Sequence, residues 1–284
     1  MALFRAHLCA HLSDEHYFSC TWALARYAAS ISIALSVDSG SEGELPSLDH
    51  LPPEITSAVQ FYWETRSGQA EEQRTSSNTA RGGRAEVLGG GQMDGFAGLV
   101  EDLLVAEGVP RESVKHDYQA TLPGFFRHEK EWDTAVVYDG RLLAALEYKS
   151  QGSSFGNNLN NRAEEAIGSN TDLLEAYEEG VFAPSPQPFV GYLMLMADNE
   201  RSREPVGLRE PNFEADDEFQ GASYARRAEL LCLRMVRKRL VSGAAFLMSG
   251  QEEGLEGGYS EPNEELRFER FARELTSHVG AHVD

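Results

Sequence analysis

Lysine and cysteine are both scarce in this chain of 284 residues. Only four lysines occur, while the other 21 of the 25 basic residues are arginine. The four are Lys115, Lys130, Lys149 and Lys238. Three cysteines are too few, and odd in number, for a disulfide framework. This cysteine usage fits a reducing cytosol, so we expect a cytoplasmic protein.

Positive charge is also scarce relative to negative charge. The 46 acidic residues outnumber the 25 basic ones and give a formal charge of -21. Such a charge suits a nucleic-acid binder poorly in ordinary buffer. Acid excess with few lysines is typical of halophilic proteins, and at about 1 M salt the Debye length is only about 3 Å, so repulsion from DNA is screened. An acidic protein from a microbe that does not need salt is the alternative.

Long uncharged runs are missing near the N-terminus. Residues 17–37 are mostly apolar, but Arg26 interrupts them, and Asp14 and Glu15 precede them. A signal peptide has positive charge and a small-residue cleavage site there. We therefore expect no secretory or membrane role.

The remaining pattern predicts three regions: an N-terminal extension and linker at 1–50, a main domain at 51–250, and a C-terminal loop and helix at 251–284. Apolar periodicity predicts helices and buried strands that alternate along the main domain. The helices are expected at 55–66, 92–107, 163–179, 224–240 and from 262, and the strands in a hairpin at 133–150 and at 189–196 and 244–248. This order predicts an α/β fold, with a mixed β-sheet flanked by helices.

Three charged residues lie at the ends of the apolar runs of the hairpin. Asp133 precedes one run, and Glu147 and Lys149 follow the other. Glu147 and Lys149 are two positions apart, so they share one face of a strand. Charge on a buried strand is costly unless it is paired or binds a metal. Two carboxylates and a lysine suit a metal-dependent phosphodiesterase, although an ordinary exposed Glu–Lys pair is the alternative.

The turn of this hairpin decides whether Asp133 can reach Glu147. A two-residue turn at Asp139-Gly140 would point Asp133 to the opposite face of the sheet from Glu147. A three-residue loop over 138–140 pairs Asp133 with Ala145 and makes it a diagonal neighbour of Glu147. We therefore predict an odd-length loop or a β-bulge in the hairpin.

Seven stretches along the chain carry a family resemblance. They are residues 61–66 (FYWETR), 91–96 (GQMDGF), 122–127 (LPGFFR), 131–133 (EWD), 147–158 (EYKSQGSSFGNN), 161–166 (NRAEEA) and 222–227 (ASYARR). In this order they resemble the XhoI-type type II restriction endonucleases of the PD-(D/E)xK nuclease superfamily. The resemblance runs from about residue 54 to 249, and Trp132 stands where the family usually has proline.

The resemblance implies a restriction-endonuclease-like core and Mg²⁺-dependent cleavage of double-stranded DNA at CTCGAG by a homodimer. A cognate DNA methyltransferase is then the expected functional partner. The resemblance assigns metal binding to Asp133 and Glu147, and the positioning of phosphate and water to Lys149. A non-enzymatic acidic protein that mimics DNA is the alternative, because the net charge is -21.

Two segments are candidates for DNA recognition. The first is a Gly/Asn-rich loop expected at 153–162, directly after Lys149. Its candidate residues are Asn157, Asn158, Asn160, Asn161 and Arg162. Asparagine can bond adenine and arginine can bond guanine in the major groove, but asparagines in a turn often bond their own backbone instead.

The second segment is the basic helix expected at 224–240, which begins with Arg226 and Arg227. Its cations can lie along phosphates. The alternative is a solvated helix face paired with acids. His116 and His128 lie near the predicted site in sequence, and we expect them to be structural or surface residues rather than catalytic ones.

Overall fold

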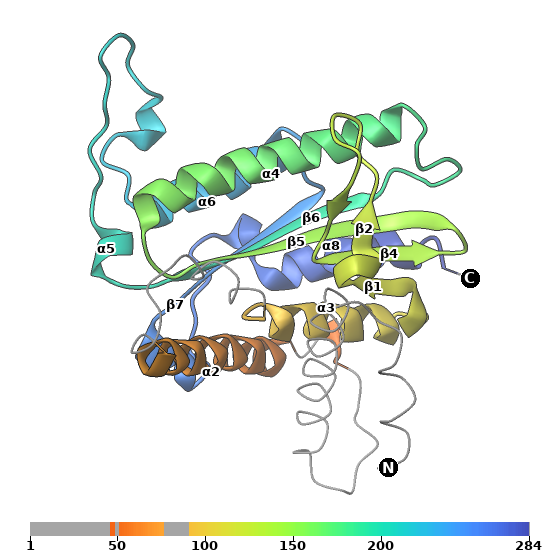
Figure 1. Ribbon diagram of the computed structural model, residues 1–284, viewed down its shortest axis with the longest axis horizontal. Coiled ribbons are helices and arrows are strands. Elements are labelled where there is room, and N and C mark those ends of the chain that lie inside the picture. Colours follow the sequence, from red (N-terminus) through yellow and green to blue (C-terminus); the bar gives the residue numbers. More distant parts are fainter. Residues whose placement is uncertain (1–45, 49–50, 77–90, 284) are drawn as a thin grey trace, which may run out of the picture. The chain divides into compact units, whose positions relative to one another are not determined.

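A five-stranded mixed sheet forms the centre of the computed structural model, which describes residues 46–48, 51–76 and 91–283 (Figure 1). The strands lie in the order β1-β4-β5-β6-β7. Their bounds are Val114–His116, Thr134–Tyr138, Arg141–Gln151, Phe189–Ala197 and Gly243–Ser249. β4 is antiparallel to β1 and β5, whereas β6 is parallel to β5 and β7. The predicted α/β class with a mixed sheet is confirmed.

Helices cover both faces of this sheet (Figure 1). On one side, α4 (Phe155–Glu178) and α6 (Tyr224–Arg237) contact each other, and they pack on β5 and β7 respectively. On the other side, α8 (Phe268–Gly280) packs on β5, β6 and β7, and α3 (Asp94–Ala106) packs against α8 and α2 (Pro52–Ser76). The short elements are α5 (Glu200–Arg203), α7 (Gln251–Leu255), η2 (Arg111–Ser113), η3 (Asp117–Ala120), η4 (Asp217–Phe219), η5 (Glu264–Leu266), β2 (Thr121–Leu122) and β3 (Lys130–Glu131).

The strands predicted from apolar runs are present. Every residue of β6 and β7 is buried, as parallel strands covered on both faces require. The helix predicted at 55–66 lies within α2, which continues to Ser76. Among the described helices, none is long and apolar enough to cross a membrane.

The C-terminal helix begins later than predicted. Asn263 caps η5 through the N–H of Glu265, and Oε1 of Glu261 accepts a 2.6 Å hydrogen bond from the N–H of Phe268, where α8 begins. α8 buries Phe268 and Leu275 among the core residues of Leu45–Asp284, which form one compact unit. The predicted extension and linker at 1–50 lies outside the described residues, apart from 46–48.

The β4–β5 hairpin contains a bulge. Tyr138 pairs with Arg141 across a two-residue turn, with φ of 49° at Asp139 and 72° at Gly140. The predicted three-residue loop is therefore wrong, because two residues with positive φ already form the tight turn that joins twisted strands. Val136 pairs with Ala144 and Val137 with Leu142, which leaves Leu143 as an extra residue. The predicted bulge is confirmed. It shifts the pairing by one residue, so that Asp133 and Glu147 lie on the same face of the sheet, which a two-residue turn alone would prevent.

The Gly/Asn-rich segment after β5 is helical, so the predicted loop at 153–162 is wrong beyond Ser154. Ser154 turns the chain in a left-handed conformation with φ of 52°, and α4 starts at the next residue. Phe155 and Leu159 are one helical turn apart and both are buried. The Phe155 ring stacks on Tyr224 of α6, with 5.8 Å between ring centroids. This packing outweighs the low helix propensity of glycine and asparagine.

Candidate active site

The three residues predicted to form a metal site converge in the β4–β5 hairpin. Asp133 directly precedes β4, and the strand register, continued by one residue, places it opposite Glu147. The backbone N–H of Tyr148 donates to Oδ2 of Asp133 at 2.6 Å. The ammonium of Lys149 contacts Oε1 of Glu147 and lies 3.8 Å from Oδ2 of Asp133. One ammonium group therefore lies between two carboxylates.

A fourth charged residue, Lys130, joins this group. Its Nζ lies 2.5 Å from Oε2 of Glu147, and its side chain is only 15% exposed. The ammonium also lies 4.6 Å from the centre of the Trp132 ring. The sequence analysis gave Lys130 no role. The chain has only four lysines, and Lys130 lies three positions before Asp133. This proximity is the sequence signal that could have placed Lys130 in the site.

The two carboxylates have different environments. Burial opposes ionisation of Glu147, but Lys149 and Lys130 outweigh it and lower the pKa of Glu147. Desolvation and the nearby Glu147 carboxylate raise the pKa of Asp133, although Lys149 and the N–H of Tyr148 oppose this rise. Opposite pKa shifts in adjacent carboxylates are common at functional sites.

His116 lies beside the backbone of Asp133. Its Nδ1 lies 3.3 Å from the backbone oxygen of Asp133 and 3.1 Å from Oγ1 of Thr134. Its Nε2 lies 2.8 Å from a carboxylate oxygen of Glu101 on α3. His128 is 88% exposed beside Glu129. The expectation that neither histidine is catalytic stays a prediction.

The donor set of the hairpin suits a small divalent cation. Within the described part of the chain, no group of three or more His, Cys, Asp or Glu side chains could hold a metal. The site thus offers two protein carboxylates, Asp133 and Glu147. Mg²⁺ prefers oxygen ligands and is usually held by one or two carboxylates, with water and substrate phosphate completing its shell. The residues present therefore fit Mg²⁺.

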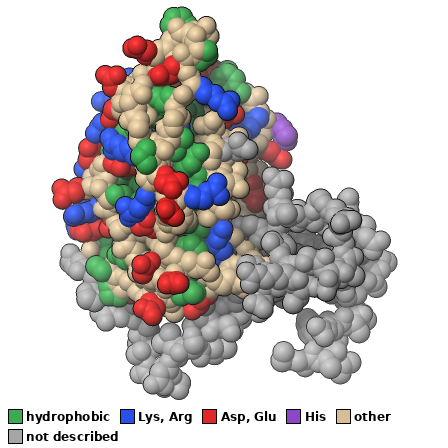
Figure 2. All heavy atoms as spheres, turned by 90° about the vertical axis from the view of Figure 1, so that its left-hand side faces the viewer, with side chains coloured by type: hydrophobic (Ala, Val, Ile, Leu, Met, Phe, Trp, Pro, Cys, Tyr) green, Lys and Arg blue, Asp and Glu red, His purple; other side chains and the backbone are tan. Residues whose placement is uncertain are grey.

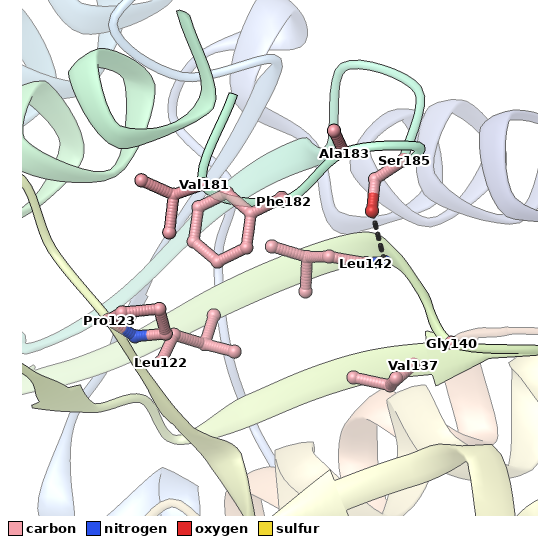
Figure 3. Close-up of a pocket in the computed structure, with 9 residues that line it drawn as sticks. All are labelled: Leu122, Pro123, Val137, Gly140, Leu142, Val181, Phe182, Ala183 and Ser185. Atoms are coloured by element: carbon pink, nitrogen blue, oxygen red, sulfur yellow. Dashed lines mark hydrogen bonds between the residues drawn. The ribbon is translucent and has the colours of Figure 1, made fainter. Parts of the chain in front are cut away.

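An apolar pocket of about 210 Å³ lies at the opposite end of the hairpin (Figure 3). It is lined by Leu122, Pro123, Val137, Gly140, Leu142, Val181, Phe182, Ala183 and Ser185. Oγ of Ser185 accepts a 2.9 Å hydrogen bond from the N–H of Leu142. Leu142 and Glu147 are five positions apart along β5, or at most about 17 Å at about 3.3 Å per residue. The pocket is therefore not the site of the charged cluster.

The candidate base-reading residues lie in the first turns of α4. Asn158, Asn160 and Asn161 are exposed, while the side chain of Asn157 lies outside what the structure describes. Nδ2 of Asn158 is 3.5 Å from the backbone oxygen of Ser153. Arg162 forms a 2.8 Å ion pair with Glu165. Asn158, Asn160 and Asn161 are therefore exposed on the helix that follows the strand carrying Lys149.

The arginines of α6 are paired with acids and backbone. Arg226 contacts Glu229 at 2.7 Å and Glu218 at 3.3 Å, and Arg227 donates to the backbone oxygen of Val206 at 2.8 Å. Figure 2 shows basic and acidic side chains interspersed on the face that it presents. Both arginines are therefore bonded within the chain, and the choice between a phosphate-binding face and an ion-paired face stays a prediction.

Comparison with known proteins identifies the family of this chain. The family model "Restriction endonuclease XhoI" matches residues 72–261. The chain belongs to the XhoI restriction endonuclease family. It is 44% identical over 216 residues to the type II restriction enzyme BstVI of Geobacillus stearothermophilus, covering 74% of this chain and 96% of that enzyme.

Two further relatives of the XhoI family are similar. The type II restriction enzyme XhoI of Xanthomonas vasicola is 43% identical over 184 residues, which are 63% of this chain and 73% of that enzyme. The type II restriction enzyme AbrI of Azospirillum brasilense is 46% identical over 159 residues, which are 55% and 71% of the two chains. No solved structure matches the chain.

Membership in the XhoI family makes this chain a type II restriction endonuclease, and a non-enzymatic DNA mimic is therefore the wrong alternative. The matched region 72–261 contains the whole charged cluster from Lys130 to Lys149, the start of α4, and α6.

Proposed function

We propose that this chain cleaves double-stranded DNA at CTCGAG in a Mg²⁺-dependent reaction. The observation that carries the proposal is that Asp133 and Glu147 face each other across the hairpin, with Lys149 in reach of both. The family membership supports the reaction class, and the relative named XhoI supports the choice of site.

In this proposal Asp133 and Glu147 hold the cation. A bound Mg²⁺ supplies Lewis-acid stabilisation of the charge that develops on the phosphate. The N–H of Tyr148 fixes the Asp133 carboxylate at 2.6 Å, so this ligand is oriented before substrate binds. Lys149 donates hydrogen bonds to the attacking water and to a phosphate oxygen. Water attacks phosphorus in line with the leaving 3′ oxygen and loses a proton to solvent. The P–O bond to the 3′ oxygen breaks, and that oxygen takes up a proton from solvent to leave as a hydroxyl.

The proposed partners follow from the symmetry of the DNA site. A palindrome presents the same half-site twice, so a homodimer with two-fold symmetry can read and cut both strands with one set of residues. Asn157, Asn158, Asn160, Asn161 and Arg162 are the proposed base readers, and Arg226 and Arg227 the proposed phosphate contacts. A methyltransferase that protects the same site in the host completes the system in the cytoplasm.

Cleavage of matched DNA duplexes tests the proposal. One duplex carries a single CTCGAG and its twin differs at one base pair, and both are incubated with Mg²⁺ or with chelator. KCl is varied from about 0.1 to about 1 M, over which the Debye length falls from about 10 to about 3 Å. We expect two fragments from the first duplex, only with Mg²⁺. Cutting at another sequence would refute the proposed specificity, and no cutting at any salt would refute the activity.

A further inference from the structure

Both carboxylate oxygens of Glu147 contact an ammonium group. Lys149 contacts Oε1, and Lys130 lies 2.5 Å from Oε2. The Glu147 side chain is 8% exposed and that of Lys130 is 15% exposed, so water screens this pair poorly. A divalent cation that binds Glu147 must therefore displace at least one ammonium.

The Lys130 ammonium has partners other than Glu147 in the position that it occupies. Its Nζ donates a 3.0 Å hydrogen bond to the backbone oxygen of Glu131 and lies 4.6 Å from the centre of the Trp132 ring. An aromatic face attracts a cation, most strongly where water is excluded. Lys149, by contrast, lies between the two carboxylates and stays within reach of Asp133 after Glu147 turns to a cation.

The charges of the four side chains match the reaction. Asp133 and Glu147 carry two negative charges, and Lys130 and Lys149 carry two positive charges, so the cluster is neutral without a cation. A bound divalent cation leaves the cluster with a net charge of two positive units. A phosphodiester has one negative charge, and attack by hydroxide adds a second in the transition state. The loaded cluster therefore compensates the charge of that transition state.

We propose that Lys130 is a second phosphate-binding lysine of the site. Its ammonium pairs with the Glu147 carboxylate until a divalent cation displaces the ammonium, which then contacts the scissile phosphodiester. This inference rests on the proposed function. Lys130 remains protonated throughout and makes no covalent bond. The cation and the DNA are thereby coupled, because cation binding releases the ammonium that binds phosphate.

The proposal and a purely structural role of Lys130 predict opposite changes in cation affinity when Lys130 is lost. If Lys130 only held Glu147 in place, its loss would disorder the carboxylate and weaken cation binding. If Lys130 competes with the cation, its loss should strengthen cation binding while it slows cleavage. Opposite changes in the two quantities are therefore the diagnostic result.

Binding of Mn²⁺ without DNA, followed by the electron paramagnetic resonance signal of the free ion, measures the first quantity. Single-turnover cleavage of a CTCGAG duplex at saturating Mg²⁺ measures the second. The variants are Lys130→Met and Lys130→Gln, which remove the charge, and Lys130→Arg, which keeps it. Arg273→Met is the matched control, because Arg273 is an exposed cation on α8, outside the charged cluster and both candidate DNA-binding segments, and the change in total charge is the same.

We expect both neutral variants to bind Mn²⁺ about tenfold more tightly, since they lose a nearby positive charge, and to cleave about a hundredfold more slowly. Lys130→Arg should keep the affinity for Mn²⁺, and Arg273→Met should change neither quantity. Unchanged or weaker Mn²⁺ binding in folded neutral variants, or cleavage at the normal rate, would overturn the proposal. A native protein that cuts no duplex would refute the proposed function instead, and Mn²⁺ binding would still decide whether Lys130 competes with a cation.

Discussion

The backbone N–H of Tyr148 and Oδ2 of Asp133 are joined by a 2.6 Å hydrogen bond across the β4–β5 hairpin. This bond ties the first candidate metal ligand to the residue next to the second, Glu147. The separation of the two carboxylates is thus set by strand pairing rather than by flexible side chains. A site built on paired strands is held more precisely than one on loops.

Replacement of either carboxylate should therefore abolish cleavage without abolishing DNA binding. Asp133→Ala and Glu147→Ala should each lower single-turnover cleavage to less than about 1% of the native rate, because a ligand of the cation is lost. Glu131→Ala is the control, since Glu131 is an exposed acid close in sequence. Substantial cleavage by a folded Asp133→Ala or Glu147→Ala protein would remove that residue from the mechanism.

The proposed base readers at the start of α4 should determine sequence discrimination. Asn158→Ala, Asn160→Ala, Asn161→Ala and Arg162→Ala should each reduce the preference for CTCGAG over a one-base variant by about 1–3 kcal/mol if the residue reads a base. Competition binding with Ca²⁺ in place of Mg²⁺ measures this preference. Arg226→Ala should weaken both complexes equally if it contacts only phosphate. Full discrimination in all four α4 variants would transfer base reading to another element.

Stability and cleavage should rise with salt. The charge of -21 makes the folded chain repel itself and DNA, and concentrated KCl screens both effects. We expect the melting temperature and the cleavage rate to increase from dilute buffer to about 1 M KCl, over which the Debye length falls to about 3 Å. Equal concentrations of sucrose control for general stabilisation. A protein that melts highest and cuts fastest in dilute buffer is not salt-adapted.

Asp172 should stabilise the loop that leads to Lys130. Its Oδ1 accepts hydrogen bonds from the N–H groups of Phe125 at 2.9 Å and Phe126 at 2.6 Å, and its Oδ2 pairs with Arg127 at 2.8 Å. Asp172→Asn should lower the free energy of unfolding by about 1–3 kcal/mol near pH 6, because a buried charged acceptor is lost. Urea denaturation measures this loss, and Glu175→Gln on the same helix is the control.

The same contribution should depend on pH. Burial opposes ionisation of Asp172, but Arg127 and the two backbone N–H groups outweigh it and lower the pKa of Asp172. A lowered pKa in the folded state stabilises the fold above the ordinary carboxyl pKa of about 3.9, and this stabilisation is lost as pH falls through the folded-state value. The difference between the native protein and Asp172→Asn should therefore shrink below about pH 4. A difference that is constant from pH 6 to 3 would contradict this assignment.

Much of this architecture could be predicted because it depends on continuous apolar runs. The strands at 189–196 and 244–248 and the charged hairpin were read directly from such runs. The start of α4 could not be predicted, because Gly156 and its asparagines favour a loop locally, and the helix depends on Phe155 stacking against the distant Tyr224. Lys130 was missed for a similar reason, since its contact with Glu147 is set by the fold of the segment between η3 and β4.

The extra residue Leu143 also restricts how this family can change length. The hairpin presents Asp133 and Glu147 to each other only because the bulge adds one residue to the two-residue turn. Loss of Leu143, or insertion of one residue elsewhere in the hairpin, would turn Asp133 to the opposite side of the sheet. A functional protein with such a change needs a second change of one residue that returns Asp133 to the face of Glu147. Insertions and deletions between the two acids should therefore accumulate among functional homologues in multiples of two.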